Sequence, residues 1–215
     1  MPSFTYGQVE IEYLKRKDKK LGVAIDQIGM IEREVNPDVF SALVGSVLSQ
    51  QISTKAAQTV RQRMNTLLDG DITPQGIAGA GAEAIKGCGM STRKAGYIMG
   101  LAEAALTGVV DFGALHTLPD AQIINNLTAL SGVGVWTAEM LLIFSLCRPD
   151  VVSYGDLAIR RGMLNLYGLR ELTKDKFEKY RKRYSPYGSV ASLYLWAISV
   201  DNGMQNTAIA RNKKS

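Results

Sequence analysis

Apolar residues recur along this chain at intervals of three and four, and no segment alternates apolar and polar residues as a half-buried strand would. In residues 36–51, for example, Phe40, Leu43 and Val47 fall on one helical face, after an Asn36–Pro37 pair typical of a helix start. Turn residues separate about ten such segments, and no repeat is visible. We therefore predict an all-α fold.

Short polar residues precede several of the predicted helices. Ser53 or Thr54, Ser91 and Asp156 each stand directly before a helical segment. A side-chain oxygen at such a position accepts a hydrogen bond from the first turn of the helix. We expect these residues to be N-caps.

The 215 residues are enough for one domain, or for two small lobes that share a core. The longest apolar stretches are too short to cross a bilayer, and the mixed, charged beginning shows no secretory signal. We expect an intracellular protein, cytoplasmic and nucleoid-associated in a prokaryotic cell or nuclear in a eukaryotic one.

The chain has two cysteines, Cys88 and Cys147, and one histidine, His116. These residues cannot supply a structural zinc site or the four cysteines of an iron–sulfur cluster. We expect no metalloenzyme chemistry. The net charge of +5 is compatible with nucleic-acid binding, and also with a solvated basic surface.

Gly132 and Gly134 lie two residues apart in the segment LSGVGVWTAEMLLIF, at the entrance to an apolar helix. A turn this tight requires a positive φ, which glycine adopts without steric cost. It also exposes backbone N–H groups at the start of the helix that includes Trp136, where the helix dipole favours an anion such as phosphate. The alternative is a plain connection between two packed helices.

The segment LSGVGVWTAEMLL resembles the helix-hairpin-helix element of the DNA base-excision glycosylase superfamily, and VVSYGDLAIRRG resembles the stretch that follows it. LVGSVLSQQISTKAA, GCGMSTRKAGYIMGLA and SPYGSVASLYLWAI are similar to the alkylated-base branch, 3-methyladenine DNA glycosylase II. Together the five segments span residues 43–198. The chain resembles the compact form of this branch, without an N-terminal β-rich domain.

The resemblance implies a two-lobed, all-helical fold with the active site in the interlobe cleft. Residues 1–35 and 131–215 are expected to form the lobe that carries the catalytic aspartate. Residues 36–130 would form a central lobe leading into the hairpin at 128–137. The implied partner is double-stranded DNA with damaged bases, bound by a monomer.

By this resemblance Asp156 is the catalytic residue of a glycosylase that flips a damaged nucleotide out of the duplex and hydrolyses its C1′–N bond. The departing base leaves an oxocarbenium-like sugar, which a fixed carboxylate stabilises. On local sequence alone the role of helix N-cap comes first. The upstream hairpin favours catalysis, and both roles can coexist.

Bifunctional members of the superfamily carry a lysine directly after the hairpin, where this chain has Trp136, which cannot form a Schiff base. The resemblance therefore implies a monofunctional enzyme without AP lyase activity. Its substrates would be cationic alkylated purines of the 3-methyladenine and 7-methylguanine type, which stack on aromatic rings. The expected base pocket consists of Trp136, Trp196, Met140 and Tyr154. Trp196 can also be a core residue, and Met140 stands where the inducible bacterial member has a tyrosine.

The segment LSQQIS corresponds to the family's loop that fills the gap left by the flipped base, with Gln51 or Ile52 as the wedge. The residues expected to contact DNA are Gln50, Gln51, Ile52, Ser53, Ser131, Gly132, Val133, Gly134 and Arg160. Arg93, Lys94 and Arg161 are further candidate phosphate contacts, or solvated surface residues. No cofactor is expected apart from a sodium or potassium ion at the main-chain carbonyls of Thr128, Leu130 and Val133.

Two other functions fit the same residues. The first is a glycosylase of the same fold for deaminated bases such as uracil or hypoxanthine. The second is a non-catalytic helix-hairpin-helix DNA-binding protein, which would bind abasic DNA no better than intact duplex.

Overall fold

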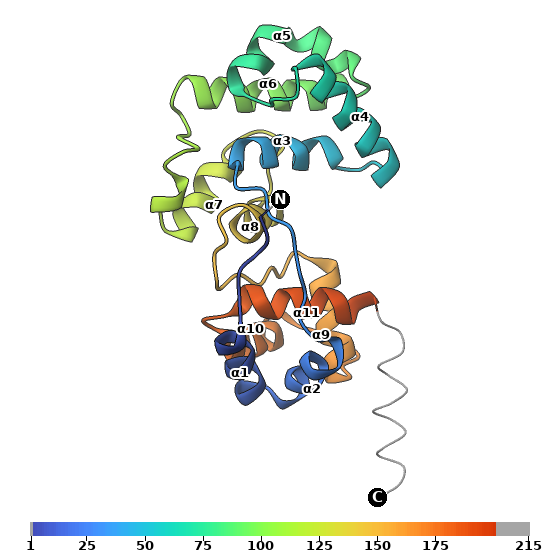
Figure 1. Ribbon diagram of the computed structural model, residues 1–215, viewed down its shortest axis with the longest axis vertical. Coiled ribbons are helices and arrows are strands. Elements are labelled where there is room, and N and C mark those ends of the chain that lie inside the picture. Colours follow the sequence, from blue (N-terminus) through green and yellow to red (C-terminus); the bar gives the residue numbers. More distant parts are fainter. Residues whose placement is uncertain (1, 201–215) are drawn as a thin grey trace, which may run out of the picture. The chain divides into compact units, whose positions relative to one another are not determined.

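The computed structural model describes residues 2–200, which form eleven α-helices, one short 3₁₀ turn and an isolated β-bridge (Figure 1). The helices are α1 (Gln8–Lys17), α2 (Lys19–Ile28), α3 (Val39–Ser49), α4 (Thr54–Leu67), α5 (Pro74–Gly87), α6 (Thr92–Leu106), α7 (Asp120–Thr128), α8 (Val135–Phe144), α9 (Leu157–Tyr167), α10 (Lys174–Tyr184) and α11 (Gly188–Val200). The prediction of an all-α fold is confirmed. No helix in this part of the chain is long and apolar enough to span a membrane.

Side-chain caps begin most of these helices, as the sequence predicts. Ser53, not Thr54, caps α4, and Ser91 caps α6, each accepting a hydrogen bond from a backbone N–H of the first turn. Helix α3 is capped by Asp38 and begins at Val39, two residues after Pro37. Such caps satisfy backbone donors that have no partner within their own helix.

The described residues fall into two compact units. Pro2 and Val35–Leu146 form the central unit, and Ser3–Glu34 with residues 147–200 form the terminal unit. The boundary expected before residue 131 lies instead after Leu146, because α8 packs against α7 and α3 of the central unit. The hairpin therefore belongs to the central unit and Asp156 to the terminal unit.

In the terminal unit, α9 and α11 approach each other closely at Gly162. A Cβ at this position would overlap the carbonyl group of Leu195, with 2.8 Å to its carbon atom. Glycine is thus the residue that lets the two helices pack at this separation. Helix α11 is buried over most of its length, and α2 and α10 also pack against it. This packing holds α9, the helix that starts directly after Asp156.

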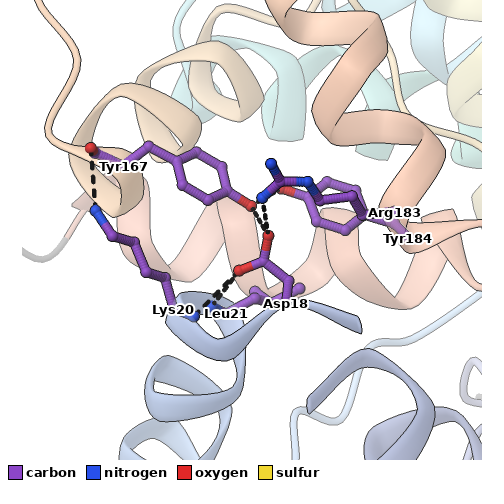
Figure 2. Close-up of polar contacts among 6 residues, drawn as sticks. All are labelled: Asp18, Lys20, Leu21, Tyr167, Arg183 and Tyr184. Atoms are coloured by element: carbon purple, nitrogen blue, oxygen red, sulfur yellow. Dashed lines mark hydrogen bonds and ion pairs between the residues drawn. The ribbon is translucent and has the colours of Figure 1, made fainter. Parts of the chain in front are cut away.

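A buried polar network joins α2, α9 and α10 in the terminal unit (Figure 2). Asp18, only 4% exposed, accepts hydrogen bonds through Oδ1 from the backbone N–H groups of Lys20 and Leu21 at 3.1 and 3.0 Å. Its Oδ2 accepts from the Tyr167 hydroxyl at 2.7 Å and from the Arg183 guanidinium at 3.1 Å. Burial raises the pKa of Tyr167, so its hydroxyl stays protonated and donates.

Candidate functional site

The hairpin of the central unit connects α7 to α8 through residues 129–134. Gly132 has a φ of +86°, the positive value that the sequence predicts for this turn. A Cβ at Gly132 would overlap the ring of Tyr97, lying 2.7 Å from its Cγ atom, so glycine is required for space as well as for conformation. Gly134 has an ordinary φ of −99°, and no atom lies within 4 Å of the place a Cβ would take.

The start of α8 presents main-chain donors at the surface. Gly134 is the N-cap residue of this helix and, as a glycine, makes no side-chain capping hydrogen bond. The first N–H groups of a helix have no intrahelical partner, and the positive end of the helix dipole lies there. Ser131, Gly134 and Val135 are exposed, whereas the Val133 side chain is buried and anchors the turn. This arrangement can bind a phosphate through backbone atoms.

The loop after α3 is tied to this hairpin. The Gln50 side-chain amide donates from Nε2 to the carbonyl of Gly132 at 2.9 Å, so two predicted DNA-contacting segments lie side by side. Gln51 has a φ of +57°, which is uncommon for a residue with a side chain. Gln51 and Ile52 are both exposed, and the Ser53 hydroxyl caps α4. The loop therefore offers Gln51 and Ile52 to the surface, while the Gln50 amide nitrogen is used within the protein.

Two residues of α6 complete this face of the central unit. The Lys94 ammonium donates to the carbonyls of Leu48 and Gln50, at 2.9 and 2.8 Å. Tyr97 lies three residues further along α6, and its ring packs against Gly132. The sequence suggested Lys94 as a phosphate contact, yet its ammonium is bonded to the loop. No sequence signal pointed to Tyr97, apart from its helical spacing from Lys94.

In the terminal unit, Asp156 is the N-cap of α9, as predicted, and is 7% exposed. Its Oδ1 accepts hydrogen bonds from the backbone N–H groups of Ala158 and Ile159, both at 2.9 Å. These bonds fix the orientation of the carboxylate, and the N-terminal end of the helix dipole stabilises its negative charge. The next residue, Leu157, is 75% exposed. The chain therefore holds a fixed, largely buried carboxylate directly beside an exposed residue.

Tyr154 and Arg160 lie close to Asp156 and pack on each other. The Arg160 guanidinium carbon is 4.9 Å from the centre of the Tyr154 ring, and Phe177 meets the same ring edge-on at 5.0 Å. The Nε atom of Arg160 is buried and has no hydrogen-bond partner among the described residues. Arg160 therefore covers one face of Tyr154.

The predicted pocket residues divide between the two units. Trp136 and Met140 lie one turn apart on α8, with Trp136 46% exposed and Met140 half-buried. Tyr154 and Trp196 belong to the terminal unit, and Trp196 is half-buried on α11 rather than part of the fully buried core. All four side chains thus have some surface within reach of solvent.

The described residues contain no cluster of three or more histidine, cysteine, aspartate or glutamate side chains that could hold a metal ion. Burial raises the pKa of both cysteine thiols, Cys88 and Cys147. At the hairpin, the Leu130 carbonyl accepts a hydrogen bond from the Val133 N–H at 3.2 Å. A carbonyl oxygen has two lone pairs, so this bond leaves one for a cation.

Comparison with known proteins identifies relatives over nearly the whole chain. The family model described as HhH-GPD superfamily base excision DNA repair protein matches residues 44–186. DNA-3-methyladenine glycosylase 1 of Schizosaccharomyces pombe is 31% identical over 201 residues, covering 92% of this chain and 88% of the relative. The crystal structure of a DNA-3-methyladenine glycosidase from Bacillus halodurans has a TM-score of 0.84 and 36% identity, and the match covers 93% of each chain. The Schizosaccharomyces pombe 3-methyladenine DNA glycosylase in complex with abasic DNA has a TM-score of 0.79 and 30% identity, covering 91% of this chain and 98% of that one.

Proposed function

The chain belongs to the HhH-GPD superfamily of base excision DNA repair proteins, and on that premise we propose that it is a DNA glycosylase that removes alkylated purines and leaves an abasic site. Similarity to proteins named 3-methyladenine glycosylases supports this substrate class. The observation that carries most weight is Asp156, a fixed carboxylate at the start of α9. Its negative charge complements the cationic sugar that forms as the base departs.

The proposed reaction begins with extrusion of the damaged nucleotide from the duplex. Backbone N–H groups of the hairpin and of the first turn of α8 bind a phosphate without regard to base sequence. Gln51 or Ile52, both exposed on the loop after α3, fills the gap in the base stack. Asp156 then stabilises the oxocarbenium-like sugar and orients the attacking water.

The damaged base is held by stacking. A 3-methyladenine or 7-methylguanine nucleotide carries a positive charge, which the face of a tryptophan attracts. Trp136 is the favoured platform because its ring is 46% exposed at the start of α8. Met140 lies one turn further along the same helix and would line the pocket beside Trp136. In the terminal unit, Trp196 is a second candidate for stacking, whereas Tyr154 offers less surface because Arg160 covers one of its faces.

We further propose that the protein acts as a monomer on double-stranded DNA, wherever the cell keeps its DNA. It requires no iron–sulfur cluster or other redox cofactor. The carbonyls of Thr128, Leu130 and Val133 would bind one sodium or potassium ion, whose charge would support the phosphate contact of the hairpin.

The substrate class is tested by base release from duplex oligonucleotides that each carry one lesion. We expect release of 3-methyladenine analogues and 7-methylguanine, and little release of uracil or hypoxanthine, because only the alkylated purines are cationic. Release of deaminated bases alone would favour the alternative substrate class. A protein that releases nothing and binds abasic-analogue DNA no more tightly than intact duplex would be a binding module.

Strand cleavage provides a separate prediction. Because Trp136 cannot form a Schiff base, we expect the protein to release the base without cutting the DNA strand. Incubation with abasic DNA and sodium borohydride should trap no covalent complex, while a bifunctional glycosylase run in parallel should be trapped. A borohydride-trapped adduct on any lysine of this chain would contradict the prediction.

A further inference from the structure

We propose that Lys94 is a positioning residue for damage recognition, which holds the loop at residues 48–53 against the hairpin so that both segments meet DNA as one rigid body. The inference rests on the proposed function, in which this loop and this hairpin contact the DNA. It assigns Lys94 a role different from the direct phosphate contact that its charge suggests.

The ammonium of Lys94 points to the carboxyl end of α3. Its two acceptors are the carbonyls of Leu48, in the last turn of that helix, and of Gln50, its C-cap residue. Carbonyls at a helix end have no intrahelical donors and carry the negative end of the dipole, so a cation stabilises them. Burial lowers the pKa of Lys94, as expected for an ammonium drawn partly out of water.

Gln50 continues the connection to the hairpin. Its carbonyl accepts from Lys94 while its side-chain amide donates to the carbonyl of Gly132. Gly132 in turn lies against Tyr97, on the same helix as Lys94 and three residues further on. The contacts thus form a closed ring from α6 through the loop to the hairpin and back to α6.

This ring holds a loop that includes a sparsely populated backbone conformation. Gln51, at a φ of +57°, directly follows the residue that the ring fixes. A non-glycine residue keeps such a conformation only when its surroundings enforce it. Because hydrogen bonds hold both the carbonyl and the side-chain amide of Gln50, Gln51 and Ile52 are kept at the surface before DNA binds. Loss of the Lys94 ammonium should release them.

The test compares Lys94→Met with the wild type, and uses Lys86→Met as the matched control. The Lys86 side chain, on α5, is 42% exposed and forms a surface ion pair with Glu83 at 3.4 Å. Affinities are measured over a salt series for intact duplex and for duplex with a tetrahydrofuran abasic analogue. We expect Lys94→Met to lower the preference for abasic DNA by about 10- to 100-fold, because misplaced recognition groups lose their contacts. The slope of log affinity against log salt should stay unchanged.

A second variant separates positioning from folding. Gln50→Leu removes the side-chain amide that donates to Gly132 and keeps the Gln50 carbonyl that accepts from Lys94, and it should lower the same preference. The double variant should lose little more than the worse single variant, since both break one ring. General destabilisation would reduce the active fraction for both DNAs equally, so the ratio of the two affinities would not move.

Hydrogen exchange of the free protein tests the positioning itself, whatever the function. Amides of residues 50–53 should exchange faster in Lys94→Met than in the wild type or in Lys86→Met. Unchanged exchange there would overturn the proposal. A salt slope lower by about 1, with equal losses on both DNAs, would also overturn it and make Lys94 a phosphate contact. If exchange rises but even the wild type shows no preference for abasic DNA, the proposed function fails and the role of Lys94 in the loop stands.

Discussion

Replacing Asp156 with asparagine should lower the single-turnover rate of base release from alkylated DNA by about 10²- to 10⁴-fold. In the proposed mechanism, the substitution removes the negative charge that stabilises the cationic sugar, and with it the group that orients water. Asparagine is nearly as good an N-cap as aspartate, because its side-chain oxygen can still accept from Ala158 and Ile159. Stability and DNA binding should therefore be retained while chemistry is lost.

The matched control is Asp38→Asn, the same substitution at the N-cap of α3. Asp38 is exposed and accepts a hydrogen bond from the Ser41 N–H at 3.0 Å. The Asp38→Asn variant should release the damaged base at the wild-type rate. If Asp156→Asn changed the melting temperature but not the rate, Asp156 would be a cap alone.

The second large effect concerns Asp18, and it should appear in stability. Substituting Asp18 by alanine should lower the free energy of unfolding by about 3 kcal/mol, from loss of a helix cap and of two further hydrogen bonds to a buried carboxylate. Figure 2 shows all four donors around its two oxygens, from Lys20, Leu21, Tyr167 and Arg183. For a chain of this length the melting temperature should fall by roughly 6–12 °C.

A comparison with Asp26→Ala isolates the effect of burial. Asp26 forms an ion pair with Lys15 at 2.7 Å, but its side chain is 61% exposed. Exposed ion pairs contribute little to stability, so this variant should melt close to the wild type in scanning calorimetry. Equal melting temperatures for the two alanine variants would show that the Asp18 network adds nothing to stability.

The helical content and most helix starts could be predicted from the sequence, because spacing of apolar residues and capping chemistry are local properties. The boundary between the units could not. Helix α8 buries the consecutive residues Leu141, Leu142 and Ile143, which point in different directions around the helix, so no single apolar face indicates which helices it packs against. That information lies in the contacts of α8 with α7 and above all with α3, which is distant in sequence.

The candidate site was predictable to a similar extent. The positive φ of Gly132 follows from the chemistry of a tight turn, and the cap role of Asp156 follows from its place before an apolar helix. The hydrogen bond from Gln50 to Gly132 joins residues 82 positions apart, and the local sequence around neither residue predicts it. Asp18 stands among lysines and arginines in the segment KRKDKK, a pattern typical of a solvated surface, and its burial depends on Tyr167 far along the chain.

The division of the chain into units also sets the order in which they can form during synthesis. Apart from Pro2, the central unit is the continuous segment Val35–Leu146, so it can fold once Leu146 has left the ribosome. Helices α1 and α2 emerge earlier but must wait for α9, α10 and α11, which complete the terminal unit. Throughout that interval Asp18 lacks Tyr167 and Arg183. The nascent chain thus completes the unit that contains the hairpin before the unit that contains Asp156.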